Sequence, residues 1–195
     1  HLSIRRQRQM CIRDSIDTSL ADGRKPEWLK VKASFGDNFK DLKQLMGGLQ
    51  LNTVCEQAGC PNIYECWEMR EATFLIGGED CTRRCGFCQI KTGKPAGYDT
   101  DEPRRVAEAV EHLGLRFVVV TMVARDDLDD GGAWLVAETI RQVRERTPDV
   151  GVEVLPSDFG YGLDPAKGLA ALQQVVDAPP DVFAFNLETT RRLFK

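Results

Sequence analysis

The chain has 195 residues and a formal net charge of −4, with 42% hydrophobic and 29% charged residues. This length can bury one sizeable core or form part of a larger domain. The slightly acidic balance provides no basic field, which argues against nucleic acid as a partner. No apolar run reaches the ~20 residues of a membrane span and no secretory signal is visible, so we expect a cytoplasmic protein without a membrane partner.

Residues 1–23 are predicted to be a non-native or disordered arm. Residues 1–15 lack an initiator methionine and clear periodicity, and they carry several arginines without matching acids. A basic targeting arm is the alternative, since transit peptides are rich in Arg and Ser. Cys11 lies in this arm and is therefore not a candidate metal ligand. We expect native protein to start near Lys25.

Residues 24–70 are predicted to form an N-terminal extension that carries cysteines. Apolar residues in it share the spacing of one face of an amphipathic helix, namely Phe39, Leu42, Leu45 and Met46. The glycine pair that follows them would end this helix.

Six of the seven cysteines form two closely spaced triplets, a density that indicates metal rather than disulfides in an apparently cytosolic chain. The first triplet is C-x4-C-x5-C and the second triplet is C-x3-C-x2-C. They consist of Cys55, Cys60 and Cys66, and of Cys81, Cys85 and Cys88. Polar residues and Pro61 within the first triplet favour an irregular loop. Each triplet has the density of one metal centre, and a single site using all six cysteines is the alternative.

The second triplet follows a buried strand predicted at residues 72–76, so we expect it on the loop after that strand. Three thiolates can hold an iron–sulfur cluster while leaving one of four irons without a protein ligand. The amino and carboxylate groups of S-adenosylmethionine can chelate such an open iron. Phe87 is predicted to cover the adenine ring. A structural zinc site is the alternative, but zinc ligands usually come as two distant pairs.

Alternating strands and helices are predicted over the rest of the chain. Three more strands are expected, at residues 117–121, 152–155 and 182–185. Three helices are expected, from Pro103, over residues 133–146 and from Asp164-Pro165. The strand at 117–121 lacks alternation, which is typical of burial on both faces. The apolar positions of the last helix are Leu169, Leu172 and Val176.

This alternation predicts an α/β fold with a parallel sheet and crossover helices. About four β/α units are present in residues 71–195, either as an open sheet or as an arc of a β/α barrel. Both architectures bind ligands at the carboxyl ends of the strands. The polar residues that follow the strands are therefore candidates for cofactor binding.

Four such residues are predicted to bind the cofactor. Thr121 and Arg125 follow the second strand, and Asn186 and Glu188 follow the fourth. A Glu at such a position can hydrogen-bond ribose hydroxyls or an ammonium group. Asp158 follows the third strand and could cap a helix or serve the site. The alternative is that these loops are solvated turns.

Taken together, these segments resemble the lipoyl synthase family of radical S-adenosylmethionine (radical SAM) enzymes over about residues 25–195. The double cysteine triplet is the specific element, because most radical enzymes of the superfamily have only the second triplet. The matching segments are KPEWL at Lys25, TVCEQAGCPNIYECW at Thr53, ATFLIGGEDCTRRCGFC at Ala72, RDDLDDGGA at Arg125 and NLET at Asn186.

The resemblance implies a sulfur-inserting transferase that uses two 4Fe-4S clusters and S-adenosylmethionine, on a partial radical SAM-type barrel. The second triplet would bind the cluster that cleaves S-adenosylmethionine to a 5′-deoxyadenosyl radical, which removes hydrogen from a protein-bound octanoyl chain. The first triplet would bind an auxiliary cluster, which is consumed as sulfur enters at C6 and C8 to form the lipoyl cofactor. No catalytic residue is implied beyond the cluster cysteines.

Protein partners are also implied by the resemblance. The substrates would be octanoylated lipoyl carrier domains, those of the glycine cleavage H protein and of the acyltransferase subunits of 2-oxoacid dehydrogenases. The electron donor would be a reductant of the ferredoxin or flavodoxin type.

Some positions depart from the family pattern. Phe185 stands where the family commonly has His, and Met122 and Leu135 stand where many members have Ser and His. The chain ends at Lys195, before an Arg-Ser-Ser-Tyr motif whose serine completes the auxiliary cluster in the family. We therefore expect an amino-terminal fragment with a truncated barrel and poor activity by itself.

Two other functions fit the sequence. One is another radical SAM enzyme that has an auxiliary cluster and a different substrate. The other is a non-catalytic iron–sulfur binding module or electron carrier, which would normally supply a fourth cysteine near each triplet.

Overall fold

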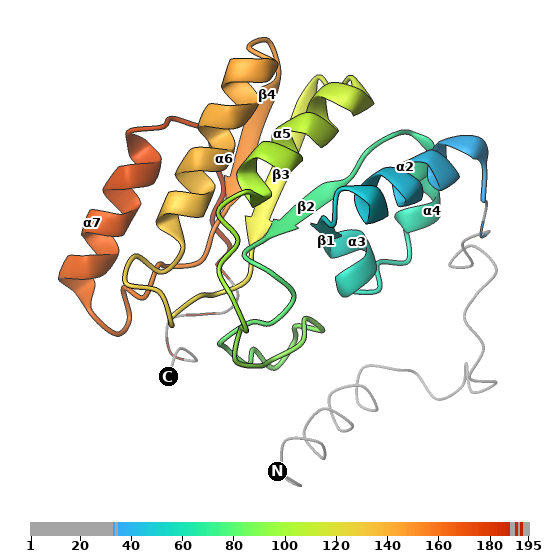
Figure 1. Ribbon diagram of the computed structural model, residues 1–195. Helices are drawn as coiled ribbons and strands as arrows, with labels where there is room; N and C mark the ends of the chain where they lie inside the picture. The colour runs from blue at the N-terminus through green and yellow to red at the C-terminus, as the bar shows by residue number, and fades with distance from the viewer. Residues whose placement is uncertain (1–32, 34, 188–189, 191, 193–195) are drawn as a thin grey trace, which may run out of the picture. The chain divides into compact units, whose positions relative to one another are not determined.

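The computed structural model describes residue 33, residues 35–187, and residues 190 and 192. Within this part of the chain, a five-stranded sheet has the order β1-β2-β3-β4-β5 (Figure 1). The strands are β1 Asn52–Thr53, β2 Thr73–Ile76, β3 Phe117–Met122, β4 Gly151–Leu155 and β5 Val182–Phe183. β1 is antiparallel to β2, and each later strand is parallel to the one before it. The predicted α/β fold with a parallel sheet is confirmed.

The helices of the described residues are α2 Asp37–Gly48, α3 Val54–Gln57, α4 Ile63–Glu68, α5 Glu102–Leu113, α6 Ala133–Arg146 and α7 Pro165–Val176. Helices α5, α6 and α7 each connect two parallel strands and lie side by side along the sheet (Figure 1). The strand order follows the chain order without a switch point. This sequence of units is the arrangement of a β/α barrel arc rather than of a doubly wound sheet.

Strand β3 carries alternating burial, so the prediction that both of its faces are buried was wrong. Val118 and Val120 are buried in the hydrophobic core, whereas Phe117 is 47% exposed. The core residues of α5 and α6, such as Val110 and Ile140, belong to the same cluster as Val118 and Val120. The helices bury the side chains of β3 that face them, whereas those on its other face stay partly exposed.

Helix α2 is confirmed where its apolar spacing predicted it. It buries Phe39, Leu42 and Met46. The Phe39 ring centroid lies 5.0 Å from that of Trp67 and 5.6 Å from that of Tyr64, both on α4. Aromatic pairs of this kind add ~0.5–1.5 kcal/mol beyond area burial. Packing on α2 therefore stabilises α4, which has only 6 residues and is too short to be stable by itself.

Helix α7 begins at the predicted cap, since the Asp164 carboxylate accepts the N–H groups of the first turn. Of its predicted apolar positions, Leu172 packs against the core as expected, whereas Leu169 is 57% and Val176 51% exposed. The buried face instead contains Gly168 and Val175, together with a buried alanine between them. Small side chains on this face let α7 approach the neighbouring chain closely, as at Gly168 next to Tyr161. This close packing determines the buried face more than the size of the apolar side chains does.

Strand β5 is shorter than the predicted strand at residues 182–185. Its register pairs Val154 of β4 with Phe183, and the Ala184 N–H donates to the Val154 carbonyl at 2.8 Å. β4 ends at Leu155, and β5 is the edge strand of the sheet within the described residues. The ladder therefore stops there.

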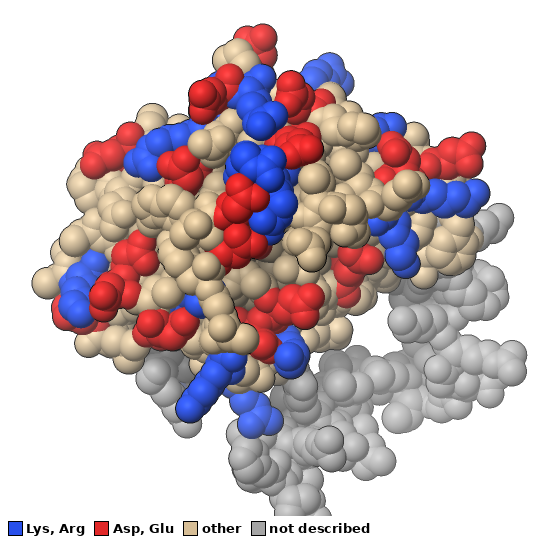
Figure 2. Space-filling view, viewed as in Figure 1, with Lys and Arg blue, Asp and Glu red and all other residues tan. Residues whose placement is uncertain are grey.

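Charged side chains of both signs are interspersed on the face shown in Figure 2. On α5 and just before it, Arg104 pairs with Asp101 and Glu108, and Arg105 pairs with Asp99 and Asp101. The exposed pairs of Arg104 contribute at most ~1 kcal/mol each, so they do not hold the fold together. The mixed signs agree with the small net charge.

Among the described residues, no helix combines the length and the apolar composition that crossing a membrane requires. The predicted arm at residues 1–23, with Cys11, lies outside the described residues. The expected start of native sequence at Lys25 lies outside them as well.

Candidate iron–sulfur site

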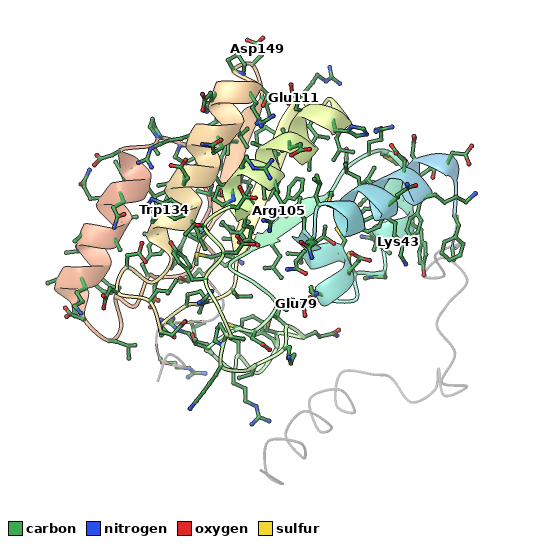
Figure 3. The ribbon with its side chains drawn as sticks, viewed as in Figure 1. Lys43, Glu79, Arg105, Glu111, Trp134 and Asp149 are labelled. Atoms are coloured by element: carbon green, nitrogen blue, oxygen red, sulfur yellow. The ribbon has the colours of Figure 1, made fainter. Side chains whose placement is uncertain are left out.

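The second triplet lies on the loop that follows β2, at the carboxyl ends of the parallel strands. The chain leaves the sheet after Ile76 through Gly77 and Gly78, whose φ angles are 89° and 96°. Glycine adopts such angles at little steric cost, so the turn depends on these two residues. Figure 3 labels Glu79 at the start of this loop and Asp149 at the opposite end of the sheet, before β4.

Two buried charged side chains hold the backbone of Gly77. The Gly77 N–H donates to Glu102 Oε2 at 2.8 Å, and the Gly77 carbonyl accepts from Arg125 Nη1 at 2.8 Å. Glu102 is 4% and Arg125 3% exposed. Burial raises the pKa of Glu102, and the Gly77 N–H and the charge of Arg125 oppose that rise. The base of the second-triplet loop is therefore fixed from both sides.

Arg125, a predicted cofactor contact, is engaged with the protein. Besides Gly77, its guanidinium donates to the Gly97 carbonyl at 2.9 Å and to both carboxylate oxygens of Asp127 at 2.9 Å. The Tyr98 ring centroid lies 6.0 Å from its central carbon. Arg125 thus joins the loop after β3 to the loop after β2, and its contact with a cofactor stays a prediction.

Cys81 has two backbone N–H donors at its sulfur atom. The Ala124 nitrogen lies 3.3 Å and the Arg83 nitrogen 3.4 Å from Sγ. The Cys81 backbone pairs with the segment that returns past it, donating to the Lys91 carbonyl at 2.8 Å and accepting from Gly93 at 3.0 Å. Hydrogen bonds to ligand sulfur atoms help to set the reduction potential of a bound cluster. The environment of Cys81 is therefore suited to a thiolate ligand.

Cys85 and Cys88 are exposed, and the Cys88 N–H donates to the Cys85 carbonyl at 3.2 Å, which closes the turn between them. Phe87 lies in this turn and is 64% exposed, so its ring is open to stacking. Within the described ranges, no group of three or more His, Cys, Asp or Glu side chains is gathered closely enough to hold a metal ion. The donor chemistry fits an iron–sulfur cluster, because one short loop carries three thiols of which two face solvent.

The first triplet lies on two short helices, so the irregular loop predicted for it was wrong. Cys55 is in α3 and Cys66 is in α4, with Cys60 in the turn between them. Thr53 caps α3, since its hydroxyl accepts the Glu56 N–H at 3.3 Å. The helices have 4 and 6 residues, too few for a hydrophobic period to appear in the sequence.

The thiols of the first triplet lie close enough to influence one another. The Cys60 N–H donates to the Cys55 carbonyl at 3.0 Å, and Cys55 and Cys66 pack against the hydrophobic core. Burial raises the pKa of the Cys66 thiol, and negative charge on Cys55 and Glu71 raises it further. A bound metal would act in the opposite direction, because a coordinating thiol loses its proton. The first triplet thus supplies three thiols from one short segment, the donor type that an iron–sulfur cluster requires.

Of the remaining predicted cofactor residues, the structure describes Thr121 and Asn186. The Thr121 hydroxyl donates to the Leu155 carbonyl of β4 at 2.8 Å. Asn186 follows β5 and is exposed, as is Phe185 beside it, and Glu188 lies outside the described residues. Thr121 thus shares the cysteine-bearing end of the sheet, and its cofactor contact stays a prediction.

Three residues that shape this end of the sheet were not singled out from the sequence, namely Arg83, Glu102 and Asp126. Glu102 stands before Pro103 at a helix start, where an acid ordinarily interacts with the helix dipole, so nothing marked it as buried. Arg83 donates to Asp126 at 2.6 Å. Arg84 has the same type and the same place between cysteines, so the sequence offered no signal that distinguished the two arginines.

Residues 75–195 match the radical SAM superfamily. The chain belongs to the radical SAM superfamily. The match starts in β2 and includes the second triplet and the strand ends around it. Residues 14–60 match the N-terminal domain of lipoyl synthase of the radical SAM family. This second match contains Cys55 and Cys60 and overlaps the arm predicted at residues 1–23.

Curated lipoyl synthases are similar to this radical SAM chain over 172 residues, 88% of its length. The relative from Kineococcus radiotolerans is 59% identical, with 50% of its length covered. The relative from Kocuria rhizophila is 60% identical with 50% covered, and that from Mycolicibacterium gilvum is 59% identical with 52% covered. The chain therefore spans about half the length of the curated relatives it matches.

Proposed function

We propose that the protein is a lipoyl synthase, which inserts sulfur at C6 and C8 of a protein-bound octanoyl chain. The observation that carries the proposal is the presence of the first triplet ahead of a radical SAM barrel arc that already carries its own triplet. The match of residues 14–60 to the N-terminal domain of lipoyl synthase supports it. The curated relatives named above support it as well.

The second triplet is proposed to hold a 4Fe-4S cluster with one open iron. With S-adenosylmethionine bound, this group supplies a radical that removes hydrogen from an unactivated carbon. The chain supplies position and charge. The Arg83 and Ala124 N–H groups donate to the sulfur of Cys81 and orient it, and the buried contacts to Gly77 hold the base of the loop. Such support is needed because a reacting group must lie within a fraction of an ångström of its productive position.

The first triplet is proposed to hold a second 4Fe-4S cluster, which serves as the sulfur source. Cys55 and Cys66 are fixed on α3 and α4 and are partly buried against the core. Trp67 of α4 is fully buried next to Cys66. A site on packed helices is placed more rigidly than one on a free loop, and partial burial limits the access of water.

The contacts of S-adenosylmethionine are proposed to be Phe87, Thr121, Arg125, Asn186 and Glu188. The exposed ring of Phe87 is free of ring contacts within the described residues, and can stack on a base. Arg125 acts mainly through its charge, because its N–H groups are engaged with Gly77, Gly97 and Asp127.

Protein partners follow from the proposed reaction. The octanoyl chain is carried as an amide on a lipoyl carrier domain, either the glycine cleavage H protein or a 2-oxoacid dehydrogenase acyltransferase. A reductant of the ferredoxin or flavodoxin type delivers the electrons. We place the protein in the cytoplasm, because thiols that bind clusters must stay reduced.

The test uses a chimera, because the chain spans about half the length of its relatives. Residues 24–195 replace the matching part of the Kocuria rhizophila lipoyl synthase, and the purified chimera receives octanoylated carrier domain, S-adenosylmethionine and reductant without oxygen. We expect mass spectrometry of the carrier to show two sulfur atoms in place of two hydrogens. A chimera that cleaves S-adenosylmethionine but forms no dithiolane would contradict the proposal.

A further inference from the structure

Arg83 lies between Cys81 and Cys85, and its guanidinium bridges two carboxylates from different loops. Nε donates to Asp126 Oδ2 at 2.9 Å, and Nη2 donates to Asp126 Oδ1 at 2.6 Å. The same Nη2 lies 2.6 Å from Asp158 Oδ1. Asp126 follows β3 and Asp158 follows β4. One side chain therefore joins the cysteine-bearing loop to the ends of two neighbouring strands.

Thr82 makes a second connection to the loop after β3. Its N–H donates to the Ala124 carbonyl at 3.0 Å, and its hydroxyl accepts the Asp126 N–H at 3.1 Å. The hydroxyl hydrogen has two acceptors in reach, the Ala124 carbonyl at 2.9 Å and Asp126 Oδ2 at 2.8 Å. Asp126 is thus held by both Thr82 and Arg83. All of these bonds are formed between residues of the chain.

The electrostatics agree with charged, hydrogen-bonded partners. The hydrogen bond from Arg83 lowers the pKa of Asp126. Burial alone would raise the pKa of Asp158, but the hydrogen bond and charge of Arg83 lower it overall. The Arg83, Asp126 and Asp158 side chains are 33%, 19% and 34% exposed, so water screens only part of their attraction. Charge-assisted bonds of this geometry fix orientation as well as distance.

Arg84 provides a comparison within the same loop. It is exposed, and the structure assigns its side chain no ion pair with another described residue. It carries the same charge and stands between the same two cysteines. Any effect specific to the bridge should therefore appear on replacing Arg83 and not on replacing Arg84.

We propose that Arg83 is a positioning residue, which with Asp126 and Asp158 holds the second-triplet loop against the ends of β3 and β4 before a cluster binds. The role of this ordered loop in cluster binding rests on the proposed function. A loop that is already ordered loses less conformational entropy when it closes around a cluster. Replacing Arg83 therefore slows cluster assembly, whereas replacing Arg84 leaves it unchanged.

The first test measures hydrogen exchange in the 195-residue chain without iron. We expect the amides of Thr82 and Asp126 to exchange about tenfold faster in Arg83→Gln than in the unchanged chain. Arg84→Gln should leave these amides unchanged. Arg83→Lys should lie between, because an ammonium group keeps the charge but lacks the planar fork. Equal exchange in Arg83→Gln and Arg84→Gln would overturn the positioning role.

The second test measures iron uptake by the second triplet during anaerobic reconstitution. The iron bound by the second triplet is the difference in iron content between the unchanged chain and a Cys85→Ala, Cys88→Ala variant. Both substitutions are at exposed positions. We expect Arg83→Gln to take up this iron several-fold more slowly than Arg84→Gln. If the unchanged chain binds no iron at the second triplet, the proposed function fails, while hydrogen exchange still decides the role of Arg83. If Arg83→Gln takes it up at the unchanged rate, the positioning role fails and the proposed function stands.

Discussion

Glu102 and Arg125 hold the two polar groups of a single residue from opposite sides. The carboxylate of Glu102 accepts the Gly77 N–H at 2.8 Å, while Arg125 donates to the Gly77 carbonyl at 2.8 Å. Glu102 begins α5, and Arg125 lies in the loop after β3. The first crossover helix and the second parallel strand thus jointly define where the chain turns toward the cysteines.

Replacing Arg125 with Ala should destabilise the fold by about 3 kcal/mol, the lower end of the range for breaking a buried ion pair, because Asp127 stays partly hydrated. The change leaves the carbonyls of Gly77 and Gly97 without their donor. Urea unfolding at neutral pH measures the loss. Arg104→Ala is the control, since its ion pairs are exposed and worth less than ~1 kcal/mol. Equal losses in the two variants would show that Arg125 is not a structural tie.

Glu102→Gln should gain stability relative to the unchanged chain as the pH rises. Burial raises the pKa of Glu102 above its ordinary value of 4.5, so the folded state binds its proton more tightly than the unfolded state does. The contribution of Glu102 is therefore fully present below pH 4.5 and is lost as the pH rises through the folded pKa. The measurement is the unfolding free energy of Glu102→Gln and of the unchanged chain from below pH 4.5 to neutral pH. A difference that is constant with pH would contradict the burial argument.

Asp181 should have the opposite pH dependence. Its carboxylate accepts the Val152 N–H at 2.6 Å and pairs with Arg144 at 2.6 Å. The Val152 hydrogen bond and then the Arg144 contact lower the pKa of Asp181. The stability it provides is present above the ordinary pKa of 3.8 and is lost as the pH falls through the folded pKa. Asp181→Asn should reduce the loss of stability in acid, as followed by circular dichroism during acid titration.

Gly168→Ala should destabilise the protein by ~1–3 kcal/mol, as overpacking does. A Cβ atom at Gly168 would lie 2.5 Å from Tyr161 Cα, which belongs to backbone that cannot swing aside. Gly47→Ala in α2 is the matched control, because its Cβ would meet nothing within 4 Å. That change should be neutral or stabilising by up to ~1 kcal/mol. Thermal unfolding of both variants checks the contrast, and a harmless Gly168→Ala would contradict the close approach of α7.

Hydrophobic patterns predicted the elements of the barrel arc, because buried strands and long amphipathic helices leave a period in the sequence. Side-chain size did not predict which face of α7 is buried, since Gly168 allows a close approach to Tyr161 that a larger side chain would block. The prediction that both faces of β3 are buried was also wrong, because burial depends on which elements pack on each face. A run such as FVVVT does not reveal that helices cover one face of the arc.

The cysteine triplets were visible in the sequence because their spacing is local. The residues that hold them were not, because their partners are distant in the chain. Arg83 and Asp126 are 43 positions apart, and Gly77 and Glu102 are 25 apart. No local pattern marks such pairs, and only the parallel sheet brings them to one edge.

The separate roles proposed for the two triplets are tested most directly in the chimera that carries residues 24–195. The measurement is the amount of 5′-deoxyadenosine and of dithiolane product in the same reaction. Cys88→Ala should abolish both products, and Cys60→Ala should abolish the dithiolane while 5′-deoxyadenosine is still formed. A Cys60→Ala chimera that still makes dithiolane, or a Cys88→Ala chimera that still makes 5′-deoxyadenosine, would contradict the account.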